Sequence, residues 1–152
     1  MKLQFYLEKL QASESFEKFM KENPKAYLCS GFIVIDKEGK DNKQHFDFFI
    51  PKEKKIFSFQ LEEDCKKVEV ERVDDKTPEE ISLDCDFDFE YLEKLIAGEM
   101  FDEKIKNKVQ KILLSLQRLN GKDFLVGTVF ISGMGIIKVN IDVAEKKIID
   151  FE

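Results

Sequence analysis

The sequence predicts an α+β fold in which an antiparallel sheet, made of strand meanders, is packed by helices. Two observations lead to this prediction. The last third of the 152-residue chain reads as an amphipathic helix followed by three short strands with tight turns between them. The middle of the chain reads as several strands in succession without a helix between them. A chain of this length fits one domain, residues 1–152.

Residues 2–22 are predicted to be helical in two pieces, because the apolar face changes phase around residues 11–13. The apolar residues of the two pieces are Leu3, Leu7 and Leu10, then Phe16, Phe19 and Met20. Ser13 is a suitable N-cap for the second piece, which ends at Asn23-Pro24. For the first piece a strand is the alternative, since Leu3, Phe5 and Leu7 also alternate.

The middle of the chain is predicted to form four strands. Residues 26–35 are apolar on both alternating faces, which is typical of a central strand covered on two sides. The next elements are a hairpin loop at 36–42, a strand at 45–50, a turn at 51–54 and a strand at 55–61. Val68 and Val70 alternate with charged residues and indicate a half-exposed strand near an edge of the sheet.

The C-terminal third is predicted to begin with helices. A polar loop at 74–86 leads to a short helix from Asp88 to Ala97, which stops at Gly98. Asp102 then caps a long helix over 103–119, which is followed by strands at 124–131, 136–141 and 147–151. The apolar stripe of the long helix consists of Ile105, Val109, Ile112, Leu116 and Leu119.

The two ends of the chain share an order of elements, and this order suggests a tandem α-β-β-β repeat with units at 1–73 and 88–152. Chance similarity is the alternative explanation. The segment from Lys104 to Glu152 resembles a PepSY-type unit in having one helix and then a three-stranded meander. Its similar features are Val139-Asn140-Ile141-Asp142 before the last turn and Ile148-Ile149 after it.

A second, looser copy of the PepSY-like unit covers residues 14–61. The resemblance implies a non-catalytic modulator or binding domain, and it assigns no site residue. The chain departs from the family in lacking the Trp or Tyr often found in the first strand and in showing no attached enzyme domain.

Composition and charge exclude several classes of function. The net charge of −6 and the pI near 5.1 argue against nucleic acid as a partner, because non-specific affinity depends on neutralising phosphates. No apolar run approaches the roughly 20 residues that span a bilayer. The charged N-terminus and three cysteines without a metal or disulfide spacing indicate a cytoplasmic protein with reduced thiols. His45 is the only histidine, which excludes a multi-histidine metal site.

Basic residues form the first candidate site. Residues 104–122 contain no acid and six bases, of which five recur at helical spacing: Lys104, Lys108, Lys111, Arg118 and Lys122. Such a stripe on the predicted long helix is suited to an acidic protein partner. The alternative is a solvated face, or one that meets the chain's own acidic segment, residues 61–93.

Three aspartates form the second candidate site. In an extended segment Asp84, Asp86 and Asp88 point the same way, and three carboxylates suit Ca²⁺ or Mg²⁺. The EF-hand template does not fit, because Phe89 stands where glycine is required. Helix capping by Asp88 and plain solubility are the alternatives.

These residues are consistent with three alternative functions. The leading hypothesis is a small soluble non-catalytic binding module without a cofactor, which contacts its partner through the basic stripe or an exposed strand edge. The second is a carrier of an apolar small molecule in a pocket lined by some of the fifteen phenylalanines. The third is a divalent-metal-dependent enzyme that uses the aspartate cluster.

Overall fold

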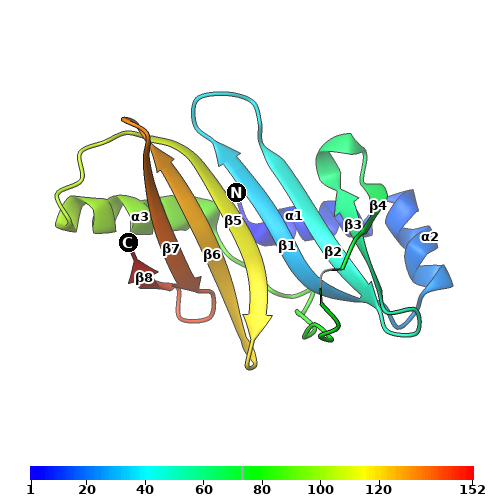
Figure 1. The fold of residues 1–152 in the computed structure, drawn as a ribbon. Coiled ribbons are helices and arrows are strands. Elements are labelled where there is room, and N and C mark those ends of the chain that lie inside the picture. The colour runs from blue at the N-terminus through cyan, green and yellow to red at the C-terminus, as the bar shows by residue number, and fades with distance from the viewer. Residues whose placement is uncertain (73) are drawn as a thin grey trace.

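A computed structural model describes residues 1–72 and 74–152 of the chain. Over these residues the chain forms three α-helices and one eight-stranded antiparallel sheet (Figure 1). The elements are α1 (Leu3–Gln11), α2 (Glu14–Glu22), β1 (Tyr27–Asp36), β2 (Lys43–Ile50), β3 (Lys55–Gln60), the 3-10 turn η1 (Leu61–Glu63), β4 (Lys66–Val70), α3 (Phe89–Asp102), β5 (Val109–Leu119), β6 (Lys122–Ile131), β7 (Gly135–Asp142) and β8 (Lys147–Phe151).

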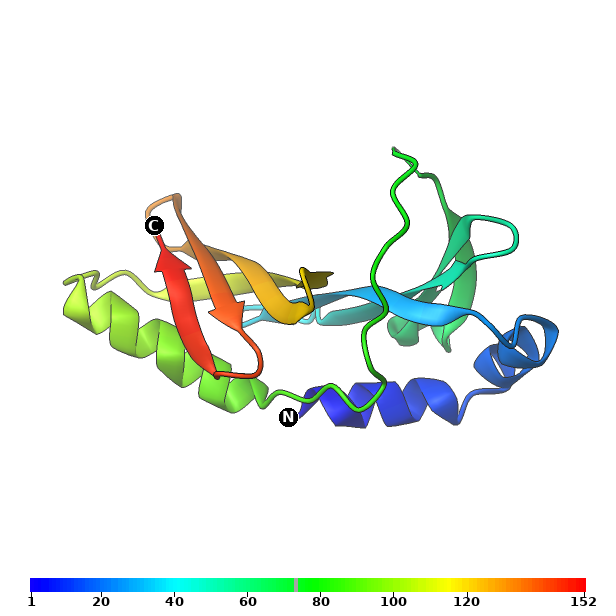
Figure 2. The same ribbon diagram turned by 90° about the horizontal axis from the view of Figure 1, so that it is seen from below.

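The strand order is β4-β3-β2-β1-β5-β6-β7-β8, so each half of the chain contributes a four-stranded meander. The two meanders join through the antiparallel pair β1–β5, in which Ile33 lies opposite Leu114. The helices lie on one side of the sheet (Figure 2). α1 and α3 begin side by side, because the Leu3 N–H donates to the Phe87 carbonyl at 2.8 Å and the Phe89 N–H donates to the Met1 carbonyl at 2.9 Å. From this point the two helices run in opposite directions.

Most of the predicted elements are confirmed. The helical region 2–22 is divided as expected, and the Ser13 hydroxyl caps α2 by accepting from the Phe16 N–H at 3.2 Å. β1 is a central strand, and β4 is at an edge of the sheet. Asp88 caps α3 by accepting from the Glu90 N–H at 2.9 Å. No helix among the described residues combines the length and the apolar character needed to cross a membrane.

The long helix predicted over 103–119 is wrong: β5 occupies Val109–Leu119. Ile112 and Leu116 are four residues apart, a spacing that fits the periods of both a helix and a strand. Leu114, between them, is also buried, which only the strand period explains. Asn120 and Gly121 have φ of 53° and 78° and form the tight turn of the β5–β6 hairpin.

The short helix predicted to stop at Gly98 continues to Asp102. Gly98 lies in the exposed part of α3, and a Cβ added there would meet nothing within 4 Å. Gly98 therefore destabilises the helix locally but does not end it. The helix continues because Ile96 and Met100, on either side of the glycine, are buried against the sheet.

Phenylalanine rings fill the space between α2 and the sheet. Phe16 lies 4.9 Å from Phe48 and 5.4 Å from Phe59, and Phe19 lies 5.1 Å from Phe59, measured between ring centroids. Close ring pairs at these distances contribute about 0.5–1.5 kcal/mol each beyond the burial of their area. These rings contact one another across the layer between helix and sheet, so they act as core residues here.

Two glycine-to-alanine substitutions test this fold, because they are expected to change the free energy of unfolding in opposite directions. A Cβ at Gly127, on β6, would lie 2.9 Å from Leu114 Cδ2 and 3.0 Å from Val139 Cγ1. Gly127→Ala is therefore expected to lower the free energy of unfolding by about 1–3 kcal/mol through overpacking. Gly98→Ala is expected to raise it by about 0.5–1 kcal/mol, because alanine favours the helix. Urea unfolding measures both, and a destabilised Gly98→Ala variant would contradict the extended α3.

Candidate interaction surface on the open face of the sheet

The side of the sheet away from the helices, here called the open face, exposes an apolar strip. Cross-strand pairing places its members in three successive rows of this face. Phe32 and Val126 both lie opposite Ser115, Leu113 lies opposite Val34 in the next row, and Phe130 lies opposite Ile136 in the third. Their side chains share the face opposite to that of the buried Ile33, Leu114 and Val129. The strip consists of Phe32, Leu113, Val126, Phe130 and Ile136, which are exposed or partly exposed, whereas Val34 on the same face is buried.

Exposure distinguishes this strip from the core. Phe32, Val126 and Ile136 are exposed by 36%, 37% and 57%. A hollow of about 730 Å³ lies at one end of the strip, between its side chains and the loop that joins β1 to β2. Large apolar side chains in adjacent rows that remain open to solvent are typical of a contact surface.

Asp36 organises the β1–β2 loop beside this hollow. Its carboxylate accepts the N–H groups of Asp41, Glu38 and Gly39 at 3.0–3.1 Å. The bond from the Asp41 N–H is the main cause that lowers the pKa of Asp36 below its ordinary value. The Asp41 carboxylate in turn lies 3.1 Å from Lys111 Nζ and 3.3 Å from Lys43 Nζ, and the bond from Lys111 lowers its pKa. Asp41 thus links the loop to Lys111 on β5, beside the strip.

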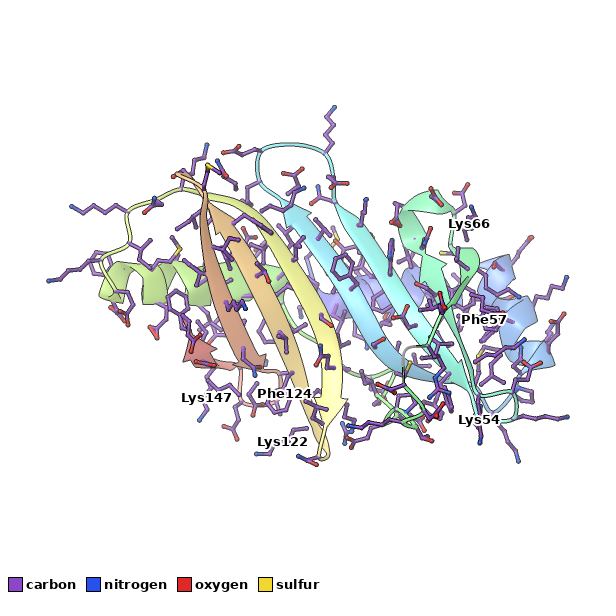
Figure 3. All side chains as sticks on the ribbon, in the orientation of Figure 1. Lys54, Phe57, Lys66, Lys122, Phe124 and Lys147 are labelled. Atoms are coloured by element: carbon purple, nitrogen blue, oxygen red, sulfur yellow. The ribbon has the colours of Figure 1, made fainter. Side chains whose placement is uncertain are left out.

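The predicted basic residues do not form a helical stripe, because the segment that carries most of them is a strand. Lys111 lies on the open face, whereas Arg118 is on the opposite face and pairs with Asp123 at 2.9 Å. Lys108 lies 3.9 Å from Glu38, in the β1–β2 loop and outside the acidic segment 61–93. Lys104 follows α3 in a left-handed conformation with φ of 59°, and Lys122 begins β6 at its lower end (Figure 3). Their role in binding stays a prediction.

The predicted metal residues mostly serve the backbone. Asp86 Oδ1 accepts the N–H groups of Gln4 and Phe87 at 3.1 and 2.9 Å, and Asp88 caps α3. Asp84 is exposed. In the part of the chain that the structure describes, no group of three or more His, Cys, Asp and Glu side chains is placed to hold a metal ion. The three aspartates are therefore not brought together as a metal centre.

One end of the open face, where β1 begins and β2 ends, is covered by a segment that the sequence predicts only as a polar loop. This segment, here called the strap, consists of residues 71, 72 and 74–81, and the chain continues from it around the strand ends to the helix side (Figure 2). The Arg72 guanidinium lies 5.1 Å above the Phe49 ring, and the Tyr27 hydroxyl donates to the Pro78 carbonyl at 2.7 Å. Beneath the strap Phe49 and Cys29 are only 2% and 7% exposed.

Glu79 fastens the strap to the β5–β6 hairpin. Its two carboxylate oxygens accept the N–H groups of Asn120 and Gly121 at 2.9 and 3.0 Å. Charge-assisted hydrogen bonds of this kind are stronger than neutral ones. The sequence signal for this contact is the Asn-Gly turn, whose N–H groups are available to an acceptor. Its acceptor, Glu79, lies 41 and 42 residues away in the sequence, so the local pattern does not identify it.

Two titratable side chains near the open face are His45 and Cys29. The His45 imidazole Nε2 contacts the Glu62 carboxylate, and the His45 ring lies 6.1 Å from the Phe32 ring between centroids. Burial is the main cause that raises the pKa of the Cys29 thiol to about 12, so this thiol stays protonated near neutral pH.

No protein-family model, curated protein or solved structure matches the chain. The function is therefore inferred from the arrangement of side chains described above.

Cys29 provides a test of the strap. Glu79→Ala removes the acceptor for the two hairpin N–H groups, so the strap should open more often and expose the thiol. We expect the rate at which a thiol reagent modifies Cys29 to rise severalfold, measured by peptide mass mapping. Cys65, which is buried outside the strap, serves as the internal reference, and Glu80→Ala is the matched control. An unchanged Cys29 rate in Glu79→Ala would contradict the fastening role.

Proposed function

We propose that this protein is a small non-catalytic binding module whose apolar strip contacts a protein partner. The observation that carries the proposal is the exposure of Phe32, Val126 and Ile136 on one sheet face, where the row of Leu113 lies between the row of Phe32 and Val126 and the row of Ile136. The strap covers the neighbouring part of the same face, so the exposed part is a bounded area and not the whole sheet. Apolar contact at the centre and charged residues at the rim is the usual anatomy of such an interface.

Charged residues around the strip restrict the partner. Lys43 and Lys111 border the strip, and Lys138 lies on the same face of β7. The acidic partner predicted from the basic residues remains a proposal, supported by these lysines. Because Asp41 already pairs with Lys43 and Lys111, apolar contact carries more of the expected affinity than charge does.

The other two functions have weaker support. A carrier needs a chamber between helices and sheet, yet Phe16, Phe19 and Phe59 contact one another between α2 and the sheet. The hollow of about 660 Å³ between α3 and β5 is the remaining space for such a ligand. A metal-dependent enzyme needs carboxylates that converge, yet Asp86 and Asp88 accept backbone N–H groups. Both ideas therefore rank below the binding module.

We also propose that the two halves arose by duplication. The support is that each half has a helical part followed by four antiparallel strands, and the strand order is symmetric about β1–β5. The PepSY-like relationship of the C-terminal half stays a prediction. Its expected helix next to the meander is replaced by β5, with α3 earlier in the chain.

Charge placed in the strip tests the proposed function. Partners captured from a lysate of the source cells by the wild-type protein are identified, purified and titrated by calorimetry. We expect Val126→Asp and Ile136→Asp each to weaken binding at least tenfold, because a carboxylate would be desolvated in the contact. Phe5→Asp is the matched control, since Phe5 is 51% exposed on α1, on the other side of the sheet.

Thermal unfolding of the same variants checks that each one remains folded. If both strip variants bind as tightly as the wild type, the strip is not the contact surface. If native mass spectrometry instead shows a bound molecule of lipid size, the carrier replaces the binding module.

A further inference from the structure

The two edges of the sheet differ in how they are protected. β4, at one edge, carries mainly charged residues, and its ion pairs join Glu69 to Lys55 at 3.9 Å and Lys66 to Glu63 at 4.0 Å. Lysines on an edge strand discourage further pairing. β8, at the other edge, is Lys-Ile-Ile-Asp-Phe, and Ile149 is 47% exposed. Lys66 and Lys147 mark the two edges (Figure 3).

Helix α3 provides a surface beside β8, here called the ledge, which carries Tyr91 and Leu95. The helix crosses beneath the C-terminal strands, and its C-terminal end projects past the last strand (Figure 1 and Figure 2). The Tyr91 hydroxyl donates to the Lys146 carbonyl at 3.3 Å, so this side of α3 faces the start of β8. Tyr91 is 41% exposed, and Leu95, Ile148 and Phe151 are partly buried against the core. The side chains of β8 and of α3 together form an apolar surface at the edge of the sheet that is open to solvent.

The backbone of β8 has unpaired groups at this edge. Glu152 exchanges two hydrogen bonds with Lys138, each 2.9 Å long. In an antiparallel ladder such hydrogen-bonded pairs alternate with pairs whose N–H and C=O groups point away from each other. Phe151, which lies opposite Val139, is in the second kind of pair, so its N–H and C=O point to the free edge.

We propose that the free edge of β8 binds an extended segment of a partner protein, as a ninth, antiparallel strand. Its main chain pairs with groups such as those of Phe151, and its alternate apolar side chains rest on Tyr91 and Leu95. The charges of β8 determine which charged residues the segment should carry at each end, because Lys147 begins β8 and Asp150 is near its end. An antiparallel segment complements them with a basic residue first and an acidic residue last. This surface is separate from the apolar strip.

A second copy of the chain is a poorer occupant of the same edge. Pairing two copies through β8 would double the eight strands of the sheet. Strongly twisted open sheets rarely exceed about 10 strands. One added strand stays within that limit, and this difference favours a segment of another protein.

The probe for this site is the capped peptide Lys-Val-Thr-Val-Thr-Val-Glu, titrated into the full-length protein and followed by NMR. We expect exchange of the Phe151 amide hydrogen to slow severalfold on binding, while the Val68 amide on β4 is unchanged. N-methylation of one alternate set of peptide nitrogens should reduce affinity at least tenfold, and methylation of the other set should not. This asymmetry is the signature of pairing at one strand edge.

Variants of α3 complete the test. Leu95→Glu places a charge on the ledge and should weaken peptide binding at least fivefold. Ala97→Glu adds the same charge to the other side of α3, beside the hollow next to β5, and should leave binding unchanged. Absence of binding, protection at Val68 instead of Phe151, or equal effects of the two methylated peptides would overturn the proposal. Because no strip residue is altered, these results are independent of the contact proposed for the open face.

Discussion

The fold depends on the antiparallel pair β1–β5, where the two halves of the chain become one sheet. Six residues of β1, from Gly31 to Asp36, lie opposite Leu116 to Lys111 of β5. Both strands place buried aliphatic side chains under the helices, among them Ile33, Ile112 and Leu114. Without this pair each half would expose the edge and the apolar face of its innermost strand, and α1 and α3 would lose their common starting point.

This central pair also decides which surfaces are available for function. Among the described residues, continuous pairing across the middle leaves only the outermost strands, β4 and β8, with free edges. The helices and the phenylalanine core occupy one side of the sheet, so the other side is the larger uncovered surface. On that side the strap, fastened by Arg72 and Glu79, divides the face into a covered part and the exposed apolar strip.

Local signals in the sequence are sufficient for most elements but not for β5. Ser13 and Asp88 act as caps because their side-chain oxygens accept the free N–H groups of the first helical turn. Such a residue just before a helical pattern can be recognised in the sequence. Residues 103–119 have apolar spacings that fit both periods, and their bases also repeat at helical spacing. The strand prevails because β1 and β6 supply partners on both sides, a tertiary effect that a local pattern does not contain.

The candidate sites were less predictable than the fold for the same reason. The basic stripe depended on helical geometry, and the strand places Lys111 and Arg118 on opposite faces. The apolar strip depends on cross-strand rows that join residues such as Phe32 and Val126, which are distant in sequence. The Asn-Gly turn after Leu119 was the one local sign of a hairpin, and it also supplies the N–H groups that Glu79 accepts.

The most direct test of the central pair is an NMR measurement of backbone shifts and cross-strand contacts in the isolated protein. The account predicts strand-type shifts over residues 109–119 and backbone nuclear Overhauser contacts between the neighbourhoods of Ile33 and Leu114. Helical shifts over this segment, or the absence of any contact between β1 and β5, would contradict it.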